Sequence, residues 1–188
     1  MQQNQPFDTL FATAQQSLLT PYSIEARHIE QVFASMLAHR LDYADLYFQY
    51  SRAESWSLEE GIVKSGSFSI DQGVGVRAVS GEKTAFAYSD DISLAALEGA
   101  AMATRAIARQ GGTQTVPMLS NKSRLLVQDK ATHLYLPHDP IASLSASKKV
   151  ALLERLERCA RALDPRVTQV MAGLSGEYEV VMVARSDG

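Results

Sequence analysis

The chain has 188 residues, 46% of them hydrophobic and 21% charged, with a formal net charge of −3. It can therefore bury a core, which excludes a disordered protein, and its slight acidic excess argues against direct nucleic-acid binding. The single Cys159 excludes an intramolecular disulfide or a multi-cysteine zinc site, and residues 1–20 lack the pattern of a signal peptide. No apolar run approaches the roughly 20 residues that span a bilayer, so we expect a cytoplasmic protein with no membrane partner.

Two helices are predicted near the N-terminus. The first is short and amphipathic and ends at Thr20-Pro21. The second begins at the candidate N-cap Ser23, because apolar residues recur at helical spacing from Ile29 to Leu37. Both helices should place an apolar stripe against a core.

From Ala44 the apolar residues alternate with polar ones, which is the period of half-buried strands. Breaks at Ser51-Arg52, Glu60-Gly61 and Ser80-Gly81 divide residues 44–89 into about four strands. The short connections favour an antiparallel β-meander. Its aromatic residues are ordinary strand formers, so we expect most of them in the sheet core rather than on a ligand platform. They are Tyr47, Tyr50, Trp56, Phe68, Phe86 and Tyr88.

A covering helix, a connector and a third strong helix follow the meander. Asp90-Asp91 offers an N-cap for a helix that reaches about Gln110, and its small residues indicate close packing on the sheet. Residues 111–146 contain three prolines among polar residues and are predicted to be a partly ordered connector. Ser147 caps the next helix, which ends at Asp164-Pro165 and has an apolar stripe made of Val150, Leu153, Leu156, Ala160 and Leu163.

The C-terminal segments 167–174 and 177–185 predict a β-hairpin across Ser175-Gly176. Ser186-Asp187-Gly188 is then a turn signal with nothing after it, so we expect residues 1–188 to be the N-terminal domain of a longer protein. The predicted fold class is α+β, an antiparallel β-meander packed against amphipathic helices with a C-terminal β-hairpin. Within it we expect three parts, namely 22–110, the connector 111–146, and 147–188.

Residues 73–78 fit the dinucleotide pattern G-x-G-x-x-A, but their setting does not. That pattern needs a helix to follow it, whereas Phe86 and Tyr88 soon resume a strand. Glycine within a strand indicates a bulge, a bend or the close approach of another backbone. The last alternative is functional, because a substrate or partner strand could make that approach.

The remaining reactive residues give no clear catalytic set. His28, His39, His133 and His138 lack metal-ligand spacing, so a metal site is not expected. Cys159 lies near the apolar stripe of its helix and is expected to be an inert buried thiol. The alternative is a reactive thiol whose pKa is lowered by the neighbouring arginines 155, 158 and 161.

Several segments of the chain closely resemble one protein family. They are residues 41–49 (Leu-Asp-Tyr-Ala-Asp-Leu-Tyr-Phe-Gln), Glu54-Ser55-Trp56, residues 71–84 around the glycines, and residues 174–179. These segments resemble the N-terminal part of the TldD/PmbA metallopeptidase family, also described as modulators of DNA gyrase. The resemblance runs from about residue 22 to the end.

The resemblance implies a zinc-dependent peptidase that trims unfolded or modified peptides together with a related TldE/PmbA-type subunit or a second copy of itself. The family's metal motif, an H-E-x-x-x-H helix, belongs to the C-terminal half and is absent from this sequence. We therefore expect zinc in the full-length protein, no cofactor and no catalytic residue in this chain, and no activity of the chain alone.

The function expected from the resemblance is a domain that walls the substrate channel and contributes to subunit contact. An exposed strand can hold an extended peptide through its main chain, which suits a peptidase that acts on many unfolded segments. Candidate binding residues are Asp71, Gln72, Gly73, Gly75 and Arg77. One alternative is a non-catalytic domain that binds a specific gyrase-related or antitoxin-like protein, and another is a thiol enzyme that uses Cys159. A downstream H-E-x-x-x-H would favour the first reading.

Overall fold

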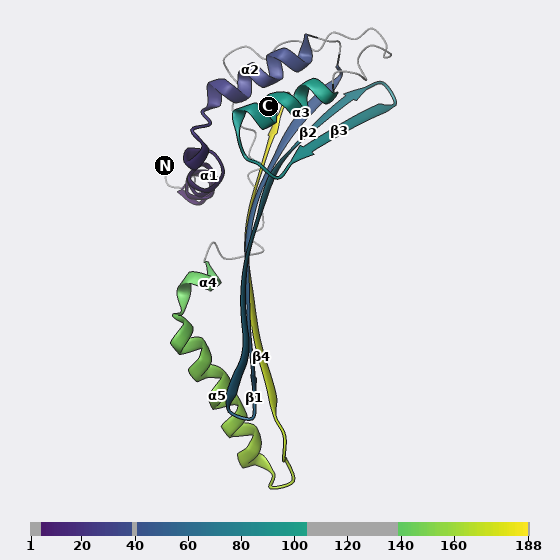
Figure 1. Ribbon diagram of the computed structural model, residues 1–188. Helices are drawn as coiled ribbons and strands as arrows, with labels where there is room; N and C mark the ends of the chain where they lie inside the picture. Colours follow the sequence, from purple (N-terminus) through teal and green to yellow (C-terminus); the bar gives the residue numbers. More distant parts are fainter. Residues whose placement is uncertain (1–4, 39–40, 105–138, 188) are drawn as a thin grey trace. The chain divides into compact units, whose positions relative to one another are not determined.

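The computed structural model describes residues 5–38, 41–104 and 139–187 (Figure 1). The predicted connector 111–146 therefore lies outside the described residues except for its last part. In chain order the described elements are α1 (Gln5–Leu18), the 3-10 helix η1 (Thr20–Tyr22), α2 (Ala26–Leu37), β1 (Tyr43–Glu59), β2 (Ile62–Ser80), β3 (Lys83–Ser89), α3 (Leu94–Thr104), α4 (Pro140–Ser143), α5 (Ala146–Leu163) and β4 (Met171–Arg185).

The four strands form one antiparallel sheet in the order β3-β2-β1-β4. The β2–β3 register runs from Val74 opposite Ser89 to Ser80 opposite Lys83. Ser186 N donates to Ala44 O at 2.9 Å and Glu60 N donates to Val170 O at 3.4 Å, which fixes β4 antiparallel beside β1. The predicted α+β class, an antiparallel sheet packed with helices, is confirmed.

Two of the predicted turns are confirmed and one strand break is wrong. Glu60 and Gly61 both have positive φ, 51° and 75°, as a two-residue hairpin turn requires, and Gly81 has φ 59°. In contrast, β1 continues without interruption through Ser51-Arg52. Neither residue has a positive φ, so nothing there turns the chain.

The predicted C-terminal β-hairpin is also wrong. Ser175-Gly176 lies inside β4, a single strand of 15 residues. Gly176 does not take a positive φ, so it does not form a tight turn. Its place opposite Glu54, whose Oε1 is 3.9 Å from the Cβ position of Gly176, reflects pairing with β1 instead. The long partner strand, rather than a local turn, decides the conformation of this segment.

The described chain forms two compact units. The first contains residues up to 50, 72–104 and 180–187, and the second contains 51–71 and 139–179. In the first unit one sheet face is buried, with Leu46, Phe48, Val76 and Ala78 fully buried. Helix α3 packs on β3, and α2 packs against α3 (Figure 1). The opposite sheet face of this unit is open.

The caps of α2 and α3 differ from the predicted ones by a few residues. Glu25 begins α2 and forms a capping box with His28, whereas Ser23 ends η1 at φ 56°. Ser93 Oγ accepts a hydrogen bond from Ala96 N at 3.1 Å at the start of α3. Asp91, which was predicted to cap this helix itself, accepts from Ser93 Oγ instead.

In the second unit α5 buries two charged residues together with Leu153, which is a member of its predicted apolar stripe. Its buried residues are Lys149, Leu153 and Glu157, four residues apart. Leu156 and Leu163 are 50% and 87% exposed, so the stripe prediction is wrong for both. The N-cap is Ser145 rather than Ser147, while the predicted end at Asp164 is confirmed.

The buried charges of α5 are paired. Lys149 forms an ion pair with Glu54 of β1 and donates to Ile141 O of α4 at 2.6 Å. Glu157 pairs with Arg161 at 3.0 Å. These contacts satisfy charges that would otherwise be costly to bury.

The helices in the described part of the chain include none with the length and apolar character of a membrane-spanning helix.

Candidate functional site

The open sheet face of the first unit presents two rows of side chains across the strands. The registers place Arg185, Asp45, Arg77 and Phe86 in one row. The next row contains Val183, Tyr47, Gly75 and Tyr88. Successive residues of a strand point to opposite faces. The side chains of these two rows are exposed except for Asp45, which is only 6% exposed, and Gly75 is buried as well. A charged row thus lies beside a largely apolar row.

Gly75 lies beneath an aromatic ring. A Cβ atom at this position would be 2.9 Å from Cε2 and 3.0 Å from Cζ of Phe86, and 3.8 Å from Tyr47 Cβ. Gly75 does not have a positive φ, so the alternative of a positive-φ bulge does not hold at this residue. The glycine lets the Phe86 ring lie over the strand, an arrangement in which an aromatic side chain covers a glycine in a sheet.

Arg77 takes part in a charge cluster on the same face. Its Nε donates to both carboxylate oxygens of Asp45, at 3.2 and 3.0 Å, and its terminal nitrogen forms an ion pair with the same group. The guanidinium groups of Arg77 and Arg185 each lie 5.7 Å from the centre of the Tyr43 ring. Burial raises the pKa of Tyr43, and Asp45 raises it further. The hydrogen bond that Arg77 donates to Asp45 raises the pKa of Arg77, which stays a cation.

The other predicted binding residues have different surroundings. Gln72 Oε1 accepts a hydrogen bond from Tyr22 OH at 2.7 Å. The Cβ position of Gly73 is 2.6 Å from Ser89 O, so this glycine permits a close approach by the chain's own backbone. Asp71 belongs to the second unit and is exposed. Of the predicted set, Gly75 and Arg77 therefore lie among the exposed aromatic side chains of the first unit.

The exposed aromatic residues were missed by the sequence reasoning. Phe68, Phe86 and Tyr88 are 57%, 62% and 79% exposed, and Tyr47 is also exposed. The prediction that sheet-core packing explains the aromatic residues is wrong for these four. Their position in the alternation was a usable signal, because Tyr47 has the opposite parity to the buried Leu46 and Phe48.

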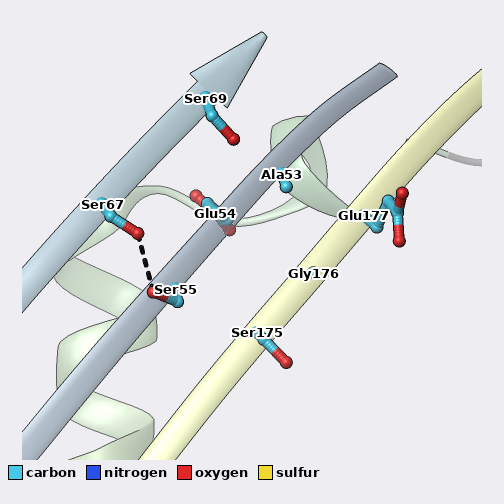
Figure 2. A pocket seen from close by; sticks show the side chains of 8 residues that line it. All are labelled: Ala53, Glu54, Ser55, Ser67, Ser69, Ser175, Gly176 and Glu177. Carbon is cyan, nitrogen blue, oxygen red and sulfur yellow. Dashed lines mark hydrogen bonds between the residues drawn. The ribbon is translucent and has the colours of Figure 1, made fainter. Parts of the chain in front are cut away.

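The second unit has a serine-rich sheet face with a shallow hollow of about 320 Å³. Figure 2 shows the residues that line it: Ala53, Glu54 and Ser55 of β1, Ser67 and Ser69 of β2, and Ser175, Gly176 and Glu177 of β4. Ser55 and Ser67 are hydrogen-bonded across the strands at 2.8 Å, as are Ser57 and Ser65 at 2.7 Å. Ser55 and Ser67 hydrogen-bond to each other, Glu54 is paired with Lys149, and no histidine lines the hollow, so the arrangement does not resemble the nucleophile–base pair of a serine hydrolase.

The reactive residues discussed from the sequence do not form a catalytic centre in the part that the structure describes. Cys159 is exposed, so the prediction of a buried thiol is wrong. His28 caps α2 through Nδ1, which accepts from Glu25 N at 3.1 Å, while His39, His133 and His138 lie outside the described residues. Within residues 5–38, 41–104 and 139–187, no three His, Cys, Asp or Glu side chains could hold a metal ion together. The described residues thus do not fit a zinc site.

Two family models match the chain and together cover more than half of it. Residues 44–108 match domain 1 of the PmbA/TldA metallopeptidases, and residues 139–188 match their central domain. The chain is 46% identical over 173 residues to the metalloprotease TldD homolog of Haemophilus influenzae and 39% identical over 174 residues to that of Buchnera aphidicola subsp. Schizaphis graminum. Each alignment covers 92% of this chain but only 35% and 34% of the relative, so the chain spans about a third of their length.

Solved structures agree at the level of the fold. A putative modulator of DNA gyrase from Bacteroides thetaiotaomicron has a TM-score of 0.62 at 15% identity, covering 86% of this chain and 36% of that one. TldE from Thermococcus kodakarensis has a TM-score of 0.56 at 16% identity, covering 84% and 35%. The matches to domain 1 and then the central domain, together with the TldD homologues, show that the chain belongs to the TldD/PmbA metallopeptidase family.

Proposed function

We propose that this chain forms a wall of the substrate channel and a subunit contact in a cytoplasmic TldD-type zinc metallopeptidase that cleaves unfolded or modified peptides. The metal and its ligands then belong to the rest of the protein, which makes up about two thirds of the length of the relatives. The partner is a related TldE/PmbA-type subunit or a second copy. This chain binds and positions the peptide substrate, and by itself it cleaves no peptide.

The observation that carries the proposal is the open face of the first unit. Tyr47, Phe86 and Tyr88 are exposed there beside the Arg77–Asp45 pair. A contiguous exposed apolar surface next to charged groups is typical of a binding surface. Aromatic side chains offer contact area to many apolar side chains, and Arg77 offers donors to a peptide carbonyl or carboxylate.

Substitution of the exposed aromatic residues in the full-length protein tests this function. The double variant Phe86→Ser/Tyr88→Ser should keep its fold, because both rings are more than half exposed, yet lower peptide cleavage or subunit pairing at least fivefold. The matched control is Met102→Ser on α3, which removes a side chain that is 57% exposed on a different element of the same unit.

The metal content and the melting temperature are measured beside cleavage of an unfolded peptide. Loss of cleavage or pairing with full metal content supports the proposal. Unchanged cleavage and pairing in the aromatic variant would remove this face from the function. A full-length protein that cleaves no unfolded peptide at all would instead favour the non-catalytic interaction domain.

A further inference from the structure

The outer edge of β2 has no strand beside it over most of its length. β3 pairs with β2 only from Val74 to Ser80, and β1 occupies the other side. Residues 62–71 of β2, in the second unit, are all exposed. We call this segment the 62–71 edge. Its main-chain N–H and C=O groups that point away from β1 have no strand partner among the described residues, which makes the edge a template for another strand.

The 62–71 edge has few of the features that usually protect an edge strand from pairing. Proteins guard such edges with charges, proline or bulges. Here Lys64 and the terminal Asp71 are the only charged residues, and the segment contains no proline. Phe68 and Ile70 are also exposed on it. The other edge strand, β4, carries Glu177 and Glu179 near its middle.

The sequence of this edge is complementary to itself in one antiparallel register. A twofold axis at Gly66 places Ile62 opposite Ile70 and Lys64 opposite Phe68. The first pair is apolar, and the second allows an ammonium group to meet an aromatic ring. Moving the axis by one residue, to Ser67, would instead place Ile62 opposite the polar Gln72.

Gly66 is suited to the centre of such a pair. A Cβ atom there would lie 3.1 Å from Cζ3 of Trp56, so the Trp56 ring of β1 already covers the position. Two copies of the strand can therefore meet at this point without opposing side chains at the axis. The larger residues lie two and four positions away on either side.

We propose that the 62–71 edge pairs antiparallel with the same edge of a second copy of this chain, about an axis at Gly66. The proposal rests on the subunit-contact part of the proposed function and names the surface and partner of that contact. Main-chain hydrogen bonds supply the pairing, and the Lys64–Phe68 and Ile62–Ile70 pairs set its register.

The test uses the full-length protein and measures the dimer dissociation constant by sedimentation over a range of concentrations. Phe68→Lys places a second ammonium group opposite Lys64 in both symmetric contacts and should weaken the dimer at least tenfold. Leu163→Lys is the matched control, because it adds the same charge at an exposed apolar residue of the same unit, and it should change dissociation less than twofold. Circular dichroism checks that both variants are folded.

A position swap tests the register itself. Lys64→Phe/Phe68→Lys again sets an aromatic ring opposite an ammonium group and should restore the wild-type dissociation constant. A wild-type protein that stays monomeric, a dimer insensitive to Phe68→Lys, or a swap variant as weak as Phe68→Lys would each overturn the proposal. Peptide cleavage is assayed separately: a dimer that follows the swap but cleaves nothing upholds the edge pairing and removes the peptidase function.

Discussion

Substitutions at Gly73 and Gly75 of β2 should have different consequences: the first should lower stability, and the second should lower function. At Gly73 a new Cβ atom would lie 2.6 Å from Ser89 O and 3.5 Å from Asp90 Cα, both main-chain atoms. In Gly73→Ala the strands must therefore move apart. Overpacking of this kind costs about 1–3 kcal/mol. The melting temperature of this domain should fall by about 2–12 °C, at about 2–4 °C per kcal/mol for a domain of this size.

At Gly75 the obstacle is the ring of Phe86, which is 62% exposed and can swing away into solvent. The backbone has no positive φ, and a β-branched residue fits a strand. Gly75→Val should therefore cost less than the roughly 1–3 kcal/mol that is typical of overpacking. Because it displaces a ring of the open face, the full-length variant should keep its metal while losing peptide cleavage or subunit pairing.

Gly99→Ala on α3 is the control for these two variants. Nothing lies within 4 Å of its Cβ position, so alanine should stabilise the helix by about 0.5–1 kcal/mol. Thermal melts of the full-length proteins measure the change in stability of each variant, and peptidase assays measure the change in its function. The reasoning fails if Gly75→Val melts as early as Gly73→Ala and has normal activity per folded molecule.

Three further predictions concern single side chains in the full-length protein. Lys149→Met should destabilise the protein by about 3–5 kcal/mol in chemical denaturation, because it leaves the carboxylate of Glu54 buried without its partner; Glu54→Gln/Lys149→Met should recover part of that loss. Tyr43 has a raised pKa in the folded state, so its stabilisation is complete below its ordinary pKa of 10.0 and is lost as the pH rises through the folded value. Tyr43→Phe should accordingly flatten the fall in melting temperature at alkaline pH, and an unchanged curve would contradict this. Cys159 is exposed and should react with a thiol reagent in the native protein, while Cys159→Ala should change stability by less than about 0.5 kcal/mol and leave activity intact.

The sequence predicted the features that local chemistry decides. Glu60-Gly61 forms a turn because both residues adopt a positive φ, and a glycine in the second position makes this easy. The C-terminal strand could not be predicted in the same way. Ser175-Gly176 has the composition of a turn, but β4 stays extended because β1, more than 100 residues earlier, offers a partner along its whole length. Such long-range pairing leaves no local signal.

The candidate surface was predictable only in part. The alternation of residues 46–48 places Leu46 and Phe48 on one face and Tyr47 on the other, and the structure buries the first two and exposes the third. It could not tell which face the helices cover, because that depends on where α2 and α3 pack. Gly75 and Arg77 are two positions apart in β2 and so lie on one face of the sheet, whereas the position of the Phe86 ring over Gly75 depends on the β2–β3 register.

Helix α5 shows why an apolar stripe is an incomplete guide to burial. Leu156 and Leu163 follow helical spacing yet are exposed, whereas Lys149 and Glu157 are buried. A buried ion pair contributes little net stability compared with apolar packing, since both charges must be desolvated. A buried charge that loses its partner is nevertheless destabilising. Any position of α5 that separates Lys149 from Glu54 is therefore less stable than the observed one. The charges therefore act chiefly on where the helix docks along β1, and a helix held in this way can leave its apolar residues on the outside.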